Sequence, residues 1–390
     1  MALELMPCQP LQIQLWGNQI GHTGILAPIA RSVKPPGFPA QTNSLQVHGI
    51  DHLAFGRHQL GLRRGGERQV KSCQGRRPGA TAAFDAALYL CPPLCYNRPR
   101  RVWVIIDFHT HITSPQIVAR RDECLVRDTW FRELYADPRA RLCSAGELVT
   151  EMDRSQVDRS VVCGFGWRDM EFCRLENDYI AESVARYPDR LIGLAIVNPL
   201  AGVEAVREIE RCAAAGLRGV GELMPDGQGY RLDDEEVMAP IVEAVVANDM
   251  FLLTHCSEPV GHRYPGKGTV TPDLVVRFAS LFPQATLVCA HWGGGAFLYE
   301  LMPEVAQVMG RVYYDTAASL YLYDDSIFAL ASRCALDKVL FASDYPLIPP
   351  GRFIRRMRAV DMPAASLDQI LGGNACRLLK LGDHSPAGMP

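Results

Sequence analysis

The chain has 390 residues, of which 48% are apolar, and its formal net charge is −3. This length suits a barrel domain of about 250 residues together with an extension. Because no run of about 18 uninterrupted apolar residues occurs, we expect no membrane-spanning helix. No early charged region followed by an apolar h-region occurs either, so we expect no secretory signal. The 13 cysteines lack paired spacing, which predicts reduced thiols in a cytoplasmic protein.

Residues 1–101 form a first segment that is rich in Gly, Pro, Gln and Arg and has poor hydrophobic periodicity. The segment contains 12 Lys and Arg against 4 Asp and Glu, a balance of +8. We expect a disordered basic extension without a role, such as an upstream start choice would produce. The alternatives are an organelle-targeting segment and a basic arm for nucleic acid, although few aromatic residues are present for base stacking. We therefore expect no nucleic-acid partner.

From residue 102 onward, short apolar and β-branched runs alternate with amphipathic stretches, which is typical of repeated βα units. The runs predict eight strands, at 102–108, 159–165, 191–197, 217–222, 251–255, 286–291, 312–315 and 339–343. Eight such units predict a (β/α)8 TIM barrel over residues 102–382, followed by a tail at 383–390. The alternative is an open doubly wound sheet, but no G-x-G-x-x-G motif follows any of these strands.

Polar side chains stand at the ends of five predicted strands, where a barrel gathers its catalytic groups on one face. These residues are His109 and His111 after the first strand, Glu222 at the fourth, His255 at the fifth, His291 at the sixth and Asp344 at the eighth. Two positions apart on an extended chain, the first two histidines point the same way and can share one ion. Each residue alone also fits a hydrogen bond in a loop. Together they predict a divalent-metal site, with Zn²⁺ favoured and Mn²⁺ or Fe²⁺ as alternatives.

Three phrases in this set resemble a known family. Residues 106–111 (IDFHTH), 290–295 (AHWGGG) and 341–346 (FASDYP) are similar to the amidohydrolase-related branch of the amidohydrolase superfamily. That branch includes enzymes of the aminocarboxymuconate-semialdehyde decarboxylase type and related hydrolases. The resemblance covers about residues 104–381 and carries no information on the substrate.

The resemblance implies roles for individual residues. His109, His111, His255 and Asp344 would ligate a metal ion, or Asp344 would act as the general base. His291 would bind a second ion or polarise the substrate. Many members with two ions place a carbamylated lysine at the end of strand four, where this chain has Glu222. A glutamate there resembles the bridging carboxylate of TatD-type members, so one or two ions are expected.

The bridging carboxylate favours hydrolysis as the reaction. In this interpretation a metal-activated water attacks an amide, ester or lactone of a small carboxylated substrate. The alternative is a metal-dependent, non-oxidative decarboxylation of an aromatic or muconate-like acid. A third hypothesis, a metal-binding protein without catalysis, is disfavoured because all ligand positions are filled. A homodimer is compatible with the sequence.

Candidates for substrate contact follow three of the strands. The loop at residues 257–268 is rich in Gly and Pro, and its Arg263 and Lys267 are suited to bind a substrate carboxylate. The remaining candidates are Trp167, Arg168 and Tyr345. Each of these residues also fits a solvent-exposed or packing role.

Other residues near the expected ligands receive structural roles. Asp315, after strand seven, is expected to orient a ligating histidine through its second ring nitrogen. Cys256 and Cys289 alternate with ligand positions, so they should face away from the site and belong to the core. The glycines at 293–295 indicate a close approach of the backbone to the metal site.

Overall fold

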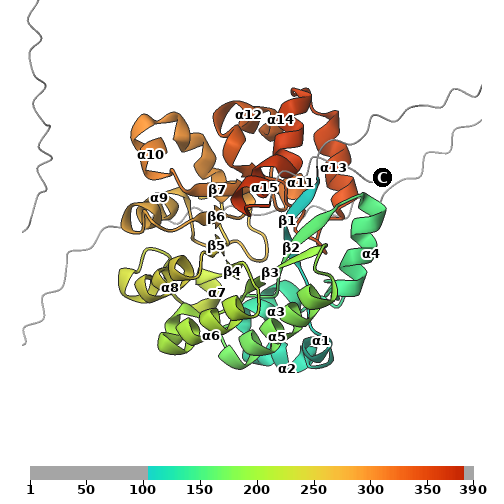
Figure 1. Cartoon of the computed structure of the whole chain (residues 1–390), viewed down its shortest axis with the longest axis vertical. Helices are drawn as coiled ribbons and strands as arrows, with labels where there is room; N and C mark the ends of the chain where they lie inside the picture. Colours follow the sequence, from blue (N-terminus) through green and yellow to red (C-terminus); the bar gives the residue numbers. More distant parts are fainter. Residues whose placement is uncertain (1–103, 382–390) are drawn as a thin grey trace, which may run out of the picture. The chain divides into compact units, whose positions relative to one another are not determined.

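A computed structural model describes residues 104–381 of the chain (Figure 1). The extension at 1–101 and the tail at 383–390, both expected from the sequence, lie outside the described residues. The domain limits at residues 102 and 382 therefore stay predictions. Within the described range, no helix is both long and apolar enough to cross a membrane.

Eight parallel strands form one sheet in which each strand pairs with the next along the chain (Figure 1). The strands are β1 (Ile106–His111), β2 (Arg159–Cys163), β3 (Leu191–Ala195), β4 (Gly219–Leu223), β5 (Phe251–Thr254), β6 (Leu287–Cys289), β7 (Val312–Asp315) and β8 (Val339–Leu340). All eight predicted strands occur in the predicted order, mostly with tighter bounds. The alternation of β-branched runs with amphipathic stretches is therefore sufficient to identify the architecture.

Hydrogen bonds between the last and the first strand regions close the sheet into a barrel. The Phe108 amide donates to the Phe341 carbonyl at 2.8 Å, and the His111 amide donates to the Tyr345 carbonyl at 2.7 Å. The buried Asp107 carboxylate accepts a further bond of 2.8 Å from the amide of Ser343. These contacts confirm the TIM barrel, and the alternative of an open doubly wound sheet is wrong.

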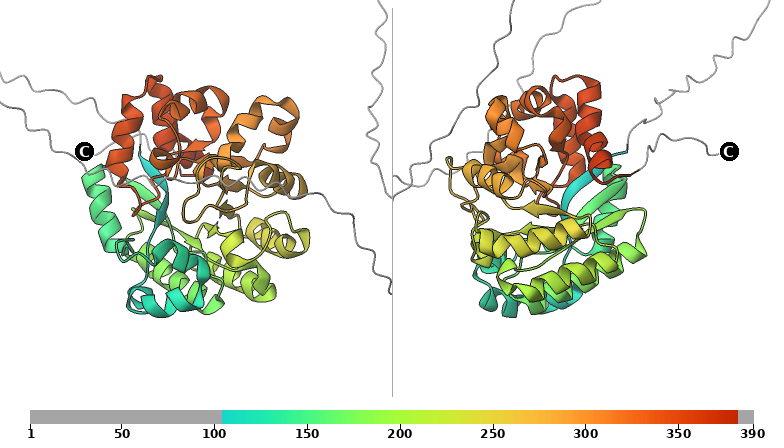
Figure 2. Two further views of the ribbon diagram at one scale, coloured as in Figure 1. Left: turned by 180° about the vertical axis from the view of Figure 1, so that it is seen from behind. Right: turned by 60° about the vertical axis from the view of Figure 1, so that its left-hand side comes forward.

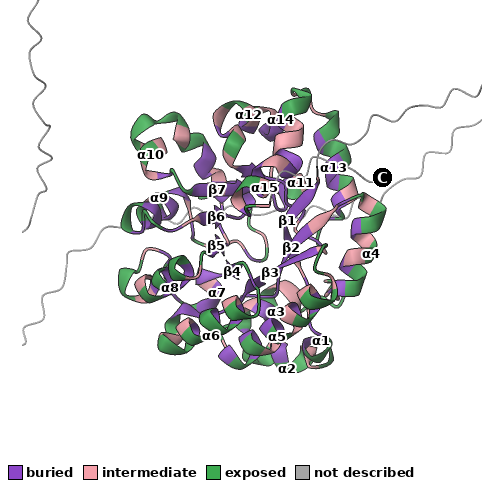
Figure 3. Cartoon of the chain, in the orientation of Figure 1, coloured by how far each residue is buried: buried purple, intermediate pink, exposed green. Residues whose placement is uncertain are grey.

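Helices surround the strands on all sides (Figures 1 and 2). Four helices lie in the β1–β2 connection, namely α1 (Pro115–Ala119), α2 (Arg121–Arg127), α3 (Thr129–Tyr135) and α4 (Ala145–Ser155). The others are α5 (Met170–Arg186), α6 (Val203–Ala214), α7 (Pro225–Gln228), α8 (Glu235–Ala247), α9 (Pro272–Leu281), α10 (Pro303–Val308), α11 (Ser319–Leu322), α12 (Ser326–Cys334), α13 (Pro350–Ala359), α14 (Ala364–Asp368) and α15 (Asn374–Leu378). The remaining helical segments are the 3-10 segments η1 (Pro199–Ala201), η2 (His291–Leu301) and η3 (Leu336–Lys338) and the π-helical segment η4 (Gln369–Gly373). The strands are buried, whereas the outer faces of the helices are exposed (Figure 3).

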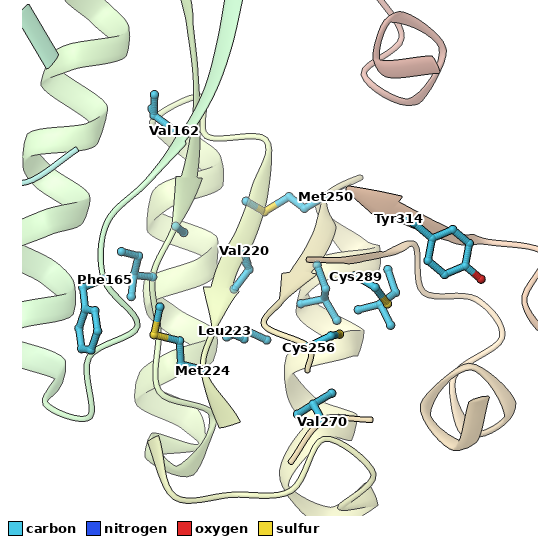
Figure 4. Close-up of a cluster of buried hydrophobic side chains, with 14 of the residues drawn as sticks. Val162, Phe165, Val220, Leu223, Met224, Met250, Cys256, Val270, Cys289 and Tyr314 are labelled. Atoms are coloured by element: carbon cyan, nitrogen blue, oxygen red, sulfur yellow. The ribbon is translucent and has the colours of Figure 1, made fainter. Parts of the chain in front are cut away.

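The apolar core has two layers. One fills the barrel interior, where the rings of Phe108 on β1 and Phe251 on β5 meet across the barrel at 5.4 Å. The other lies between strands and helices, and Figure 4 shows part of it around Val220. Cys256 and Cys289 belong to this outer layer and are fully buried, as the sequence predicts.

The glycines at 293–295 adopt a left-handed backbone conformation. The backbone at Gly294 comes close to another backbone segment, however, and not to the metal site. Gly294 has a φ of 62°, and a Cβ built on it would lie 2.2 Å from the Ser257 carbonyl oxygen. The expected approach to the metal site is therefore wrong at this position. The glycine instead allows η2 to pack against the backbone that follows β5.

We predict that Gly294→Ala destabilises the fold, because it adds both left-handed strain and a backbone clash. The free energy of unfolding should fall by about 2 kcal/mol or more. Gly146→Ala is the matched control, since its Cβ would meet nothing within 4 Å inside α4. Urea unfolding of both variants measures the difference. Equal stability of the two variants would contradict the assigned role.

Candidate metal centre

The carboxylate of Glu222 lies between two pairs of imidazoles at the carboxyl ends of the strands. Its Oε2 atom lies 3.5 Å from His109 Nε2 and 3.6 Å from His111 Nε2. Its Oε1 atom lies 2.9 Å from His255 Nδ1 and 3.7 Å from His291 Nε2. Residues from β1, β4, η2 and the position directly after β5 thus meet at one point, as the sequence predicts for a barrel.

Asp344 completes the cluster from the segment after β8. Its Oδ1 atom lies 3.4 Å from His111 Nε2. Its amide donates to the His109 carbonyl at 3.0 Å, so the same contact that closes the barrel also positions this carboxylate. Asp344 and His291 both adopt the left-handed region, with φ of 62° and 54°. Such strain in residues other than glycine often occurs at functional sites.

Each histidine uses its other ring nitrogen for a contact with an oxygen outside the cluster. These contacts are His109 Nδ1 with Asp315 Oδ2 (2.8 Å), His111 Nδ1 with the Gly164 carbonyl (3.1 Å), His255 Nε2 with the Gly266 carbonyl (2.8 Å) and His291 Nδ1 with the Ala317 carbonyl (3.1 Å). A carbonyl or carboxylate oxygen can only accept, so these outer nitrogens carry the hydrogen. The contact with Asp315 is the one that the sequence predicts.

The nitrogens that face the cluster are consequently acceptors, and they lie too close together to be stable without positive charge between them. His109 Nε2 and His111 Nε2 are 3.1 Å apart, and His291 Nε2 and His255 Nδ1 are 3.2 Å apart. Carboxylate oxygens surround both pairs. A group made only of acceptors fits a divalent cation, and imidazole with carboxylate ligands suits Zn²⁺, Mn²⁺ or Fe²⁺.

The electrostatics of the cluster agree with this fit. Burial opposes the ionisation of Glu222, but the charge and the hydrogen bonds of the surrounding imidazoles lower its pKa well below the usual range. Burial likewise lowers the pKa of His291, yet the hydrogen bond with Glu222 and the charges of Asp344, Glu222 and Asp315 outweigh it and raise that pKa to about 9. The protein therefore favours positive charge at this point, which protons or a metal ion can supply.

A cavity of about 560 Å³ opens above the cluster. Its floor contains His111, Glu222, His255, His291 and Asp344, and its walls include Trp130, Leu134, Tyr135, Arg139, Arg141, His262, Tyr264, Tyr321, Leu322 and Leu347. The walls are mainly aromatic and aliphatic, with two arginines. A flat, partly apolar molecule with an anionic group fits such a lining.

Two of the predicted substrate contacts lie in the loop after β5, which contributes His262 and Tyr264 to the cavity wall, but neither predicted residue is part of the lining. Arg263 is exposed and outside the cavity lining. The Lys267 ammonium donates to the carbonyls of Val260 and His262, the latter at 3.2 Å, so it stabilises its own loop. Periodicity does not define side-chain directions in such a loop.

The other three predicted contacts also lie outside the cavity lining. Trp167 is fully buried, and its ring stacks on Phe131 at 4.7 Å. Arg168 lines a separate surface hollow with acidic residues. Tyr345 is 3% exposed, and the Arg141 guanidinium lies 5.7 Å from its ring centre. For Trp167 and Tyr345, packing in the core explains the difference from the expectation.

The sequence interpretation missed the wall residues of the β1–β2 connection, from Trp130 to Arg141. A signal was present, because this connection is much longer than a βα unit needs. Long connections at the carboxyl face of a barrel are where substrate contacts usually lie.

Comparisons with known proteins identify relatives of this chain and structures with its fold. The 2-amino-3-carboxymuconate-6-semialdehyde decarboxylase of Dictyostelium discoideum is 24% identical over 327 residues, which cover 72% of this chain and 85% of that protein. The 5-carboxyvanillate decarboxylase of Sphingomonas paucimobilis has the same fold, with a TM-score of 0.60 and 22% identity over 71% of this chain and 99% of that one.

A second solved structure with this fold is the 5-carboxyvanillate decarboxylase of Novosphingobium aromaticivorans, complexed with manganese and 4-hydroxy-3-methoxy-5-nitrobenzoic acid. Its TM-score is 0.59, with 21% identity over 72% of this chain and 96% of that one. The amidohydrolase family model (Amidohydro_2) matches residues 106–381, which is most of the chain. The chain therefore belongs to the amidohydrolase family.

Proposed function

We propose that the protein is a metal-dependent decarboxylase that removes CO₂ from a small hydroxylated aromatic or muconate-like acid. The observation that carries the proposal is a cluster of inward-facing acceptors at the floor of an aromatic cavity. The relatives named above are decarboxylases, which supports this reaction over the hydrolysis that the sequence favours. The complex of one relative with manganese supports Mn²⁺ as a cofactor alongside Zn²⁺.

His109, His111, His255 and Asp344 would hold the ion, with Glu222 and His291 beside it. A bound divalent ion would supply positive charge that holds a substrate oxygen and stabilises the negative charge developing as CO₂ leaves. The aromatic walls hold the substrate ring and exclude water. When the carbon–carbon bond breaks, its electron pair stays on the ring carbon, which then takes one proton. His291 Nε2, at the cavity floor, is positioned to hold that proton.

Hydrolysis with two ions is a second candidate, which the position of Glu222 favours. Each of its carboxylate oxygens faces a different pair of imidazoles, as a carboxylate that bridges two cations would. The number of ions per chain separates the two candidates, because a decarboxylase of the proposed kind needs only one.

We predict one ion per chain in protein purified with Mn²⁺ or Zn²⁺, measured by elemental analysis. Glu222→Gln should retain that ion, because the histidines and Asp344 remain. His255→Ala should lose most of it, whereas His262→Ala, an imidazole at the cavity wall outside the cluster, should keep it. Two ions in the wild type that fall to one in Glu222→Gln would instead support hydrolysis.

We predict release of CO₂ from carboxylated substrates such as 5-carboxyvanillate, with retention of the other ring substituents. Asp344→Asn should reduce turnover by at least about 100-fold, because it removes a charged group at the reacting end of the cavity. Mass spectrometry of the ring product and quantification of CO₂ measure the reaction, and a chelator followed by Mn²⁺ is the control. Turnover of amides, esters or lactones without CO₂ release is the outcome that contradicts the proposal.

A further inference from the structure

Tyr135, the last residue of α3, places a free hydroxyl group on the wall of the cavity. The residue lines the cavity together with the acidic and imidazole groups of the floor. Its hydroxyl makes no hydrogen bond to any residue in the range 104–381. The neighbouring wall residue Tyr264 differs, because its hydroxyl donates to Glu258 Oε2 at 2.9 Å. Tyr135 therefore has a donor available for a ligand.

The ring of Tyr135 is held rigidly by its neighbours. It stacks on Phe131 at 4.7 Å with an interplanar angle of 29°, and its edge contacts Phe165 at 6.1 Å. The backbone is fixed as well, since the Arg121 guanidinium donates to the Tyr135 carbonyl at 2.7 Å. Packing thus determines where the hydroxyl points, and a preorganised donor loses little entropy when it binds a ligand.

The hydroxyl responds to the charges of the cluster. Burial raises the pKa of Tyr135, the charge of His111 opposes this effect, and the charges of Asp344 and Glu222 add to it. Apart from Cys163, the charged residues that act on the phenol are those of the candidate metal centre. A phenol in this environment stays protonated and serves as a hydrogen-bond donor.

We propose that Tyr135 is a substrate-binding residue that donates a hydrogen bond to the phenolic oxygen of a hydroxylated aromatic acid. The proposal rests on the decarboxylase function proposed above and narrows its substrate class. A ligand that fills the cavity without an oxygen at this position would leave the hydroxyl buried and unpaired. Such an unpaired group costs about 1–3 kcal/mol, so Tyr135 would select against ring acids that lack the phenol.

The test compares two ligands on Mn²⁺-loaded protein by isothermal titration calorimetry. One is 4-hydroxy-3-methoxy-5-nitrobenzoic acid, and the other is 3-methoxy-5-nitrobenzoic acid, which lacks the phenol. Tyr135→Phe removes only the hydroxyl and keeps the stacking on Phe131. The preference of the wild type for the hydroxylated ligand should fall about tenfold in this variant. Tyr313→Phe is the matched control, because the Tyr313 hydroxyl also lacks a described partner but lies outside the cavity lining.

Equal metal content and melting temperature of Tyr135→Phe and the wild type establish that the change is local. An unchanged preference, or an equal loss of affinity for both ligands, would overturn the role of Tyr135 while leaving the decarboxylase proposal intact. If the wild type bound neither ligand, both the proposed aromatic substrate class and the proposed role of Tyr135 would be wrong. The CO₂ assay with muconate-like acids would then decide the reaction separately.

Discussion

The candidate site depends on one electrostatic constraint, namely that six acceptor groups must share positive charge in a small buried volume. Glu222 is central, because its two oxygens face two different pairs of imidazoles. The surrounding backbone carbonyls and Asp315 fix the hydrogen on the far side of each ring and so aim the lone pairs inward. Strand ends, left-handed residues and the barrel closure all serve to bring these groups together. Without positive charge in the cluster, nothing would compensate for the free-energy cost of burying its two carboxylates.

The sequence predicts the barrel and the six cluster residues because both depend on regular spacing. Alternation of apolar runs identifies the eight strands, and residues at strand ends must converge in a parallel barrel. Asp315 follows from the same logic. Residues in loops do not obey such spacing, so the directions of Trp167, Arg263 and Lys267 could not be derived. Trp167 lies in the segment after β2, yet its ring packs in an aromatic cluster with Phe131, a contact that only the fold reveals.

The choice between decarboxylation and hydrolysis depends on the same six groups of the cluster. The relatives within the family favour decarboxylation. The position of Glu222 instead favours a second ion and hydrolysis. The cavity adds independent information, because its aromatic walls and its arginines suit a flat anion. The β1–β2 connection supplies the wall residues from Trp130 to Arg141. The cluster thus forms the floor of the cavity, while a single long connection supplies much of its wall.

The closure of the barrel has a consequence for how the protein matures. The amide of Asp344 donates to the carbonyl of His109, so the first and the last residues of the candidate metal centre are held against each other. During synthesis on the ribosome, His109 emerges some 230 residues before Asp344, given the spacing of the two in the sequence. The candidate metal centre cannot be completed until nearly all of the barrel has been translated. Loading with a metal ion would therefore be a late event, and the nascent chain would carry an unfinished site for most of its synthesis.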